Sequence, residues 1–414
     1  MKQTLKSLGA TAIVLSSAGA ILVGAVMRDR VDVGGANDTM LVSGLIASRD
    51  KSEVPEGDYF YEITNLLKQR YVERVDDEQK LALGAIRGMV SSLGDPDSVY
   101  MEKAVFQAHQ AMRSGEFEGI GAQLELVYTE PRKKEERIPG QPLAPEEALV
   151  SGIRIPKLTV VSIVPGGPAD KAGVQVGDYV EYVDDHWVPN AETIASFRKL
   201  QQDFANGKVE WEEISRVRQE LTKRTKKTVL PLKAREKLIV GKEGTVRVTW
   251  RRGSQSLNTN ITMGTSRLPG FSDVDGVIQM RFAPGAADAL RDAIGDKDQV
   301  VIDLRNNANG LANPMLACLE VLLPKGKHGE LKIGERTVPI EVKNGTDKPR
   351  QITLLVDKST RGAAEVFADV LTKAGVAKAT GGETAGHPIL VEDYELPDGS
   401  GYSLAVAAYL EGSK

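Results

Sequence analysis

Two short apolar runs in the C-terminal third place the strongest constraint on the fold. Residues 300–304 and 352–356 are apolar at nearly every position. Such strands are buried on both faces of a sheet, which is typical of parallel strands covered by helices. A further strand pattern and three segments of helical period alternate with them: 277–280, 286–294, 314–323 and 363–374. This order predicts an α/β core with largely parallel strands over residues 266–414.

The preceding part of the chain changes pattern twice. Residues 58–114 carry apolar positions at helical spacing, which predicts an N-terminal helical region with a hairpin and a third helix up to Arg113. Residues 115–265 contain strands separated by glycine-rich turns and predict a β unit. Two charged insertions, 129–147 and 203–242, interrupt it, and the second is expected to be a solvated helix. The predicted fold class is α+β with several domains.

The N-terminus predicts export. Lys2 and Lys6 precede an uncharged stretch at 8–27, which is long enough to span a bilayer. Residues 1–30 are therefore expected to be a membrane anchor, with a cleaved signal peptide as the alternative because 18–20 have the small-x-small pattern. Residues 31–57 form the linker. Both alternatives place the folded part on the extracytoplasmic side, periplasmic or at the cell envelope.

Composition excludes several classes of function. A net charge of −4 and a pI near 5.8 give no electrostatic support for nucleic-acid binding. Cys318 is the only cysteine, so an internal disulfide and a Cys/His zinc cage are excluded, and its apolar surroundings predict a buried thiol. The four histidines show no metal-ligand spacing. We expect neither a metal nor a cofactor.

A glycine-rich turn leads into the first predicted strand of the β unit. Its residues are Gly119, Ile120, Gly121, Ala122, Gln123 and Leu124. Backbone N–H groups in such a turn can point at a terminal carboxylate, and the strand offers an edge for an extended peptide. The pattern favours binding of protein C-termini or unfolded peptides, with an ordinary β-turn as the alternative.

Several segments, in the same order over most of residues 58–405, resemble the C-terminal processing (tail-specific) serine proteases. They are 71–77, 84–96, 114–121, 165–183 and 303–310. Residues 165–183 resemble the PDZ module of that family, and 303–310 its Asp-Leu-Arg-x-Asn-x-Gly-Gly turn. The resemblance implies a helical segment, a PDZ-like unit and a protease core. Against the family pattern the core is expected to be C-terminally short.

The resemblance also locates the family's catalytic positions, and this chain departs from them. The serine nucleophile position is Gly362, the lysine base 25 positions later is His387, and the glutamine four further on is Val391. Asn309 and Gly310 occupy the oxyanion turn, with Asn309 in place of a glycine. Glycine has no side chain to attack with, so the family mechanism cannot run through position 362. We therefore expect a catalytically degenerate member.

Two rival interpretations stay open at this point. Ser359 and Thr360 are the hydroxyl residues of the turn before Gly362, and they are expected to cap the following helix. The enzymatic alternative makes Ser359 a displaced nucleophile of an active serine endopeptidase. A third alternative is a structural envelope protein whose groove is blocked by its own insertion. The preferred interpretation is a membrane-anchored pseudoprotease that binds protein C-termini and associates with an active homologous protease.

Overall fold

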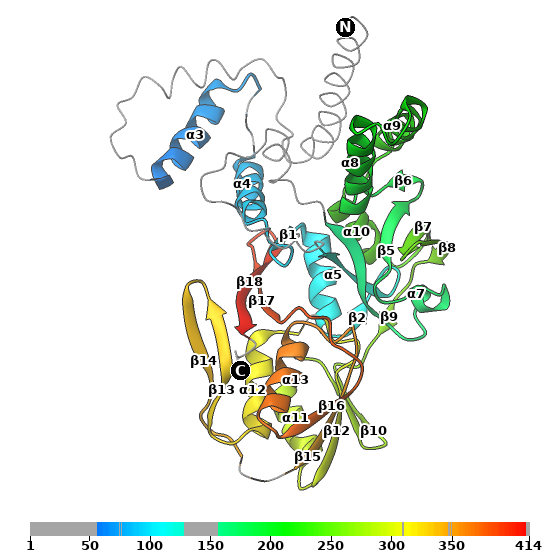
Figure 1. Ribbon diagram of the computed structural model, residues 1–414. Coiled ribbons are helices and arrows are strands. Elements are labelled where there is room, and N and C mark those ends of the chain that lie inside the picture. Colours follow the sequence, from blue (N-terminus) through cyan, green and yellow to red (C-terminus); the bar gives the residue numbers. More distant parts are fainter. Residues whose placement is uncertain are drawn as a thin grey trace, which may run out of the picture. The chain divides into compact units, whose positions relative to one another are not determined.

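The computed structural model describes residues 56–73, 75, 77–127, 156–308, 310–346, 348 and 350–410. The chain divides into two compact units, Met1–Leu93 and Gly94–Lys414. Helices and several separate sheets alternate along it, which confirms the predicted α+β class (Figure 1). The domain boundaries at 114 and 265 stay predictions, and here residues 115–265 are named the first β-unit and residues 266–410 the α/β core.

The first unit contains two described helices, α3 (Glu56–Arg70) and α4 (Glu78–Ser92). Asp77 caps α4 by accepting a hydrogen bond from the Lys80 N–H at 3.1 Å, because the first N–H groups of a helix lack intrahelical partners. The two predicted helices are confirmed, and the apolar side chains of Phe60, Ile63 and Leu67 on α3 are exposed. Their pairing as a hairpin stays a prediction.

The predicted membrane segment lies outside the described residues, as do most of the linker and the 129–147 insertion. Within residues 56–410, as far as they are described, no helix is long and apolar enough to cross a bilayer.

The first β-unit is an antiparallel sheet with the strand order β3-β4-β5-β7-β8 and with β6 beside β5. Its strands confirm the predicted β pattern. The described elements from residue 99 to residue 262 are β1 (Val99–Met101), α5 (Lys103–Arg113), β2 (Glu116–Phe117), β3 (Ala122–Val127), β4 (Lys157–Ile163), α7 (Pro168–Lys171), β5 (Tyr179–Val183), β6 (His186–Trp187), α8 (Ala191–Ala205), α9 (Trp211–Thr225), α10 (Pro231–Ile239), β7 (Thr245–Arg252) and β8 (Gln255–Thr262).

The second insertion was predicted to be one solvated helix, and this is wrong. Residues 203–242 contain the end of α8, all of α9 and all of α10. Helix α10 packs on β3 and β4, and its Ala234, Leu238 and Ile239 side chains are fully buried. The sequence pattern did not indicate this apolar face, because the helix has fewer than three turns and charged residues lie between its apolar positions.

The α/β core confirms the predicted parallel strands. Its sheet has the order β10-β11-β12-β15-β16, in which β11, β12, β15 and β16 run parallel and β10 is antiparallel. Figure 1 shows α11, α12 and α13 packed beside this sheet. The elements are β9 (Ser266–Arg267), β10 (Phe271–Val274), β11 (Val277–Met280), α11 (Ala286–Ile294), β12 (Gln299–Asp303), α12 (Ala312–Leu322), β15 (Gln351–Val356), α13 (Ala363–Lys373) and β16 (Ala377–Gly381). Cys318 on α12 is fully buried as predicted, and burial raises the pKa of its thiol to about 12.

A third sheet, which the sequence analysis did not predict, closes the core. Its order is β1-β18-β13-β14, and β17 pairs with β18. The remaining strands are β13 (Gly326–Ile333), β14 (Arg336–Val342), β17 (Ile389–Glu395) and β18 (Gly401–Leu410). Because β1 pairs with β18 through Val99↔Ser403, the loop before β1 is brought beside the loop that leads into β17. This pairing positions the candidate site.

Candidate functional site

The turn between β15 and α13 has an unusual backbone at Gly362. Its φ is 59° and its ψ is −123°, a combination outside the helical, extended and left-handed helical regions. A Cβ added there would lie 3.1 Å from the Ile389 carbonyl oxygen. Glycine relieves both constraints because it has no side chain. Sharp strand-to-helix turns of this kind hold the nucleophile in many hydrolases.

The structure brings Gly362 and His387 together, as the resemblance to the C-terminal processing proteases implied. The Gly362 N–H donates to the His387 carbonyl oxygen at 3.2 Å. His387 lies in the loop between β16 and β17, and its own N–H donates to the Glu365 carboxylate at 2.8 Å. Glu365 is buried on α13 and also accepts from the Gly386 N–H and the Thr384 hydroxyl. One carboxylate thus holds the His387 loop against the helix that follows Gly362.

The imidazole of His387 bonds to an acid rather than to a hydroxyl. Its Nε2 lies 2.7 Å from Asp97 Oδ2. Asp97 comes from the loop before β1, far away in the sequence, so no local pattern indicated this pair. His387 is therefore paired at the nitrogen that faces this loop.

A small cavity of about 50 Å³ connects these positions. Gly310 and Val391 also line it, so four of the residues predicted from the resemblance, Gly310, Gly362, His387 and Val391, lie around one space. Asn309 lies outside the described residues. The lining residues are Pro96, Asp97, Val99, Met101, His109, Arg113, Glu125, Leu126, Arg235, Ala308, Gly310, Arg361, Gly362, His387, Ile389, Val391 and Ser403.

An ion pair joins the first β-unit to the α/β core at this cavity. Glu125 on β3 lies 2.7 Å from Arg361 Nε, and the two side chains are largely buried. Arg361 also lies 3.9 Å from Asp97, the partner of His387. Gln123, one of the predicted peptide-binding residues, donates to the other Glu125 oxygen at 2.8 Å. The sequence analysis missed Glu125 and Arg361 because ion pairs between distant segments leave no periodic signal.

A second polar cluster is centred on Asp393, and its partners His109, Arg113 and Ser403 line the cavity. Arg113 donates to both Asp393 oxygens at 2.6 and 2.9 Å, and Ser403 donates to one of them at 2.6 Å. Burial opposes ionisation of Asp393, but its bonds with His109 and Arg113 lower the pKa of the carboxyl below its usual range. Burial lowers the pKa of His109, which favours a neutral imidazole. Ser403, whose proton goes to Asp393, is the one hydroxyl residue among the described residues that line the cavity.

Ser359 and Thr360 do not cap α13, which corrects the prediction. The N-cap residue of α13 is Gly362. Ser359 is 1% exposed, donates its hydroxyl proton to Asp357 and accepts from the Asn306 N–H at 2.6 Å. Thr360 donates to the Leu304 carbonyl oxygen at 3.1 Å. Both hydroxyls tie the 303–308 turn to the end of β15, and the Ser359 hydroxyl has the Asp357 carboxylate as its acceptor.

The glycine-rich turn of the first β-unit lies against the end of α10. The Gly119 N–H donates to the Gly241 carbonyl oxygen at 2.7 Å, and the Ile120 N–H donates to the Leu238 carbonyl oxygen at 2.9 Å. Gly119 has a φ of 72°, and a Cβ there would lie 2.0 Å from the Leu238 oxygen, so only glycine fits. Two of the donors predicted to hold a carboxylate therefore already have partners in the chain. Peptide binding by residues 119–124 stays a prediction.

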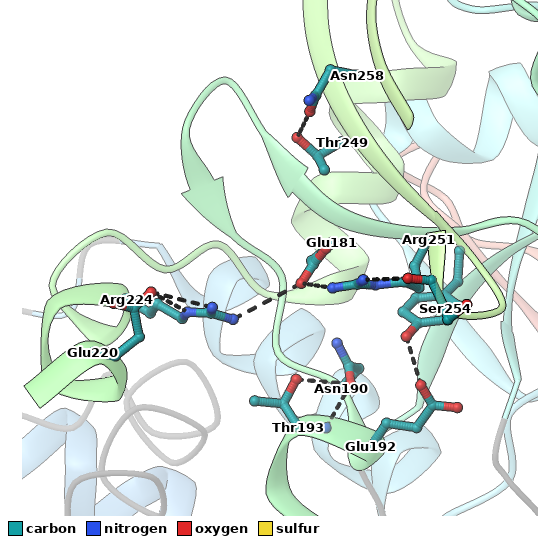
Figure 2. A network of polar contacts seen from close by, with 11 residues as sticks. Glu181, Asn190, Glu192, Thr193, Glu220, Arg224, Thr249, Arg251, Ser254 and Asn258 are labelled. Carbon is teal, nitrogen blue, oxygen red and sulfur yellow. Dashed lines mark hydrogen bonds and ion pairs between the residues drawn. The ribbon is translucent and has the colours of Figure 1, made fainter. Parts of the chain in front are cut away.

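A larger cavity of about 590 Å³ lies between α8, α9 and β5. Figure 2 shows Glu181 between Arg224 and Arg251 in the polar network beside it. The Glu181 carboxylate lies 2.9 Å from Arg251 Nη2 and 3.9 Å from Arg224 Nη1. These ion pairs join helix α9 to the sheet, so the network has a structural role. Among the described residues, no group of three or more His, Cys, Asp or Glu side chains is placed to hold a metal ion.

Comparison with known proteins agrees with this architecture. Residues 263–414 match the model of peptidase family S41, and residues 37–105 match the model described as the activating protease CtpB N-terminal domain. The photosystem II D1 C-terminal processing protease has a similar fold, with a TM-score of 0.53 at 18% identity over 86% of this chain and 89% of that chain.

Two bacterial proteins are similar in sequence. A probable CtpA-like serine protease of Staphylococcus haemolyticus (strain JCSC1435) is 28% identical over 374 residues, which is 87% of this chain and 61% of that protein. The carboxy-terminal processing protease CtpA of Bacillus subtilis (strain 168) is 26% identical over 402 residues, 90% of this chain and 70% of that protein. The chain thus spans only about three fifths of the length of the first of these relatives.

Proposed function

Because the chain is a homologue of the C-terminal processing proteases of peptidase family S41, we propose that it is a noncatalytic member that binds protein C-termini or extended peptides. The observation that carries the proposal is Gly362, which leaves the nucleophile position without a side chain. Serine catalysis needs a hydroxyl within hydrogen-bond reach of its base. His387 pairs with Asp97 instead, and the one hydroxyl residue in the described lining of the cavity, Ser403, donates its proton to Asp393.

Retained binding architecture supports the second half of the proposal. Strand β3 is at the edge of its sheet, and β4 is its one strand partner among the described strands. An extended peptide can pair with such an edge. Glu125 and Leu126 at the end of β3 also line the cavity beside Gly362. A peptide that pairs with the edge of β3 in a PDZ-like manner would therefore have one end close to Gly362.

The proposed setting is the extracytoplasmic face of a membrane. Support comes from the sequence, in which basic residues precede an uncharged stretch at 8–27. We propose that this segment anchors the protein and that an active protease of the same family is its partner, as regulator or adaptor. Affinity purification from membranes that recovers no such protease would count against the partnership.

Incubation of the full chain with an unstructured protein that ends in apolar residues tests the proposal. The expected result is saturable binding without cleavage, beside cleavage by an active relative such as the Bacillus subtilis protease. Labelling by a serine-reactive phosphonate runs in parallel on the natural chain and on Ser359→Ala. Cleavage and labelling that Ser359→Ala abolishes would refute the pseudoprotease proposal and identify a displaced nucleophile.

A further inference from the structure

Arg235 on α10 is an exception among the buried arginines. It is 7% exposed and makes no hydrogen bond or ion pair with any residue that the structure describes, and its Nε is buried without an acceptor. The other buried arginines have protein partners: Arg113 with Asp393, Arg281 with the Asn306 carbonyl oxygen, and Arg361 with Glu125. Burial of a guanidinium costs free energy unless its donors are satisfied. Arg235 therefore has an open position for an acceptor.

The Arg235 side chain lines the 50 Å³ cavity beside Gly362, together with Gly310. The nearby carboxylates of Glu125 and Asp393 are occupied by Arg361 and Arg113. Burial lowers the pKa of Arg235, and the fields of these two acids oppose the effect only in part. The site is thus a desolvated cation without a direct anionic partner in the described chain.

One nitrogen of His109, which also lines this cavity, has no hydrogen-bond partner either. The Nδ1 atom of His109 is buried and makes no hydrogen bond, while its Nε2 lies against Asp393 and Ser403. Two residues that line one small space thus each carry a buried polar atom without a partner in the described chain, and such atoms call for a physical explanation. A cavity of this volume admits an end group rather than a whole side chain or a folded element.

We propose that Arg235 binds a carboxylate of the polypeptide ligand in the cavity beside Gly362. A guanidinium presents parallel N–H donors that match a carboxylate. The alternative carboxylate donors in the glycine-rich turn are in part engaged, because the N–H groups of Gly119 and Ile120 donate to carbonyl oxygens near α10. The inference rests on the proposed function and deepens it, because it assigns the binding of the ligand's carboxylate to the cavity beside Gly362.

Peptide titrations of the full chain test this assignment. The probe is a fluorescein-labelled peptide of apolar and small residues, prepared with a free C-terminal carboxylate, with a C-terminal amide, and as an amide that contains one internal glutamate. Binding is followed by fluorescence anisotropy for the natural chain and for Arg235→Gln. Lys237→Gln is the matched control, since Lys237 lies on the same helix but is exposed and paired with Asp184.

We expect the natural chain to bind the free acid about 10-fold to 100-fold more tightly than the amide. Arg235→Gln should abolish this ratio, and Lys237→Gln should keep it. Tight binding of the glutamate-containing amide would assign the site to side-chain carboxylates, which keeps the inference but changes the source. Equal binding of acid and amide by the natural chain would overturn it and leave water as the occupant.

Acetate separates this inference from the proposed function. The melting temperature is measured in sodium acetate and in sodium chloride at equal ionic strength, for the natural chain and Arg235→Gln. If no peptide binds but acetate stabilises only the natural chain, the carboxylate site stands and the peptide-binding function fails. If acetate also has no specific effect, both fail. A large loss of stability in Arg235→Gln without acetate would contradict the inference, since an arginine without a partner should not be a structural support.

Discussion

Substitution of Gly362 by alanine should destabilise the α/β core. The native φ of 59° and ψ of −123° cost a non-glycine residue about 1–3 kcal/mol. The new Cβ would also lie 3.1 Å from the Ile389 carbonyl oxygen, so β17 or α13 must shift slightly. We expect the loss to fall in or above the upper half of that range. Serine should cost as much as alanine unless its hydroxyl finds a partner in the cavity.

A matched control separates backbone strain from the contact with Ile389. Gly375 also has a positive φ, of 73°, but a Cβ there meets no atom within 4 Å. Gly375→Ala should therefore cost only about 1–2 kcal/mol, the usual penalty of a left-handed conformation. A multidomain chain need not unfold in one step, so urea unfolding is combined with hydrogen–deuterium exchange of peptides from β15 and α13. If Gly362→Ala had the same free energy of unfolding and the same hydrogen-exchange rates as the natural chain, the prediction would be refuted.

Three further predictions concern the cavity. The double variant Gly362→Ser, His387→Lys should not cleave a fluorescent disordered substrate. Asp97 would keep a lysine at position 387 protonated, and a protonated lysine accepts no proton from the serine. Cleavage by this double variant while Asp97 is still present would contradict the prediction, whereas cleavage that needs Asp97→Asn in addition would agree with it. Burial lowers the pKa of His109, so below about pH 6.5 the unfolded chain binds a proton that the folded chain does not. The free energy of unfolding should therefore decrease as the pH is lowered. Melting temperatures from pH 8 to about pH 5 should show a flatter slope in His109→Asn, and an identical slope would exclude His109 as the cause. Glu365→Ala leaves three donors of the His387 loop without an acceptor, which should cost about 1–3 kcal/mol and speed hydrogen exchange there; unchanged exchange would show that the loop does not depend on this carboxylate.

Local patterns sufficed for most elements of the fold. The apolar runs at 300–304 and 352–356 became the parallel strands β12 and β15, because period and burial on two faces are local properties of a sequence. The β13–β14 hairpin was missed, since its strands are largely exposed and carry five Lys, Arg or Glu residues among their 15 positions. Helix α10 was mistaken for a solvated helix because charged residues lie between its apolar positions.

The sequence by itself determined which residues occupy the two positions that the family resemblance singles out. Position 362 is a glycine and position 387 a histidine, and the resemblance to the C-terminal processing proteases implied that the two lie close together, as they do. Only the tertiary structure decided what surrounds them. Asp97, Glu125 and Arg235 reach the cavity from three separate elements of the chain. Their ion pairs, and the arginine left without one, depend on the pairing of β1 with β18 and on the packing of α10 against β3, and contacts between residues so far apart carry no periodic signal.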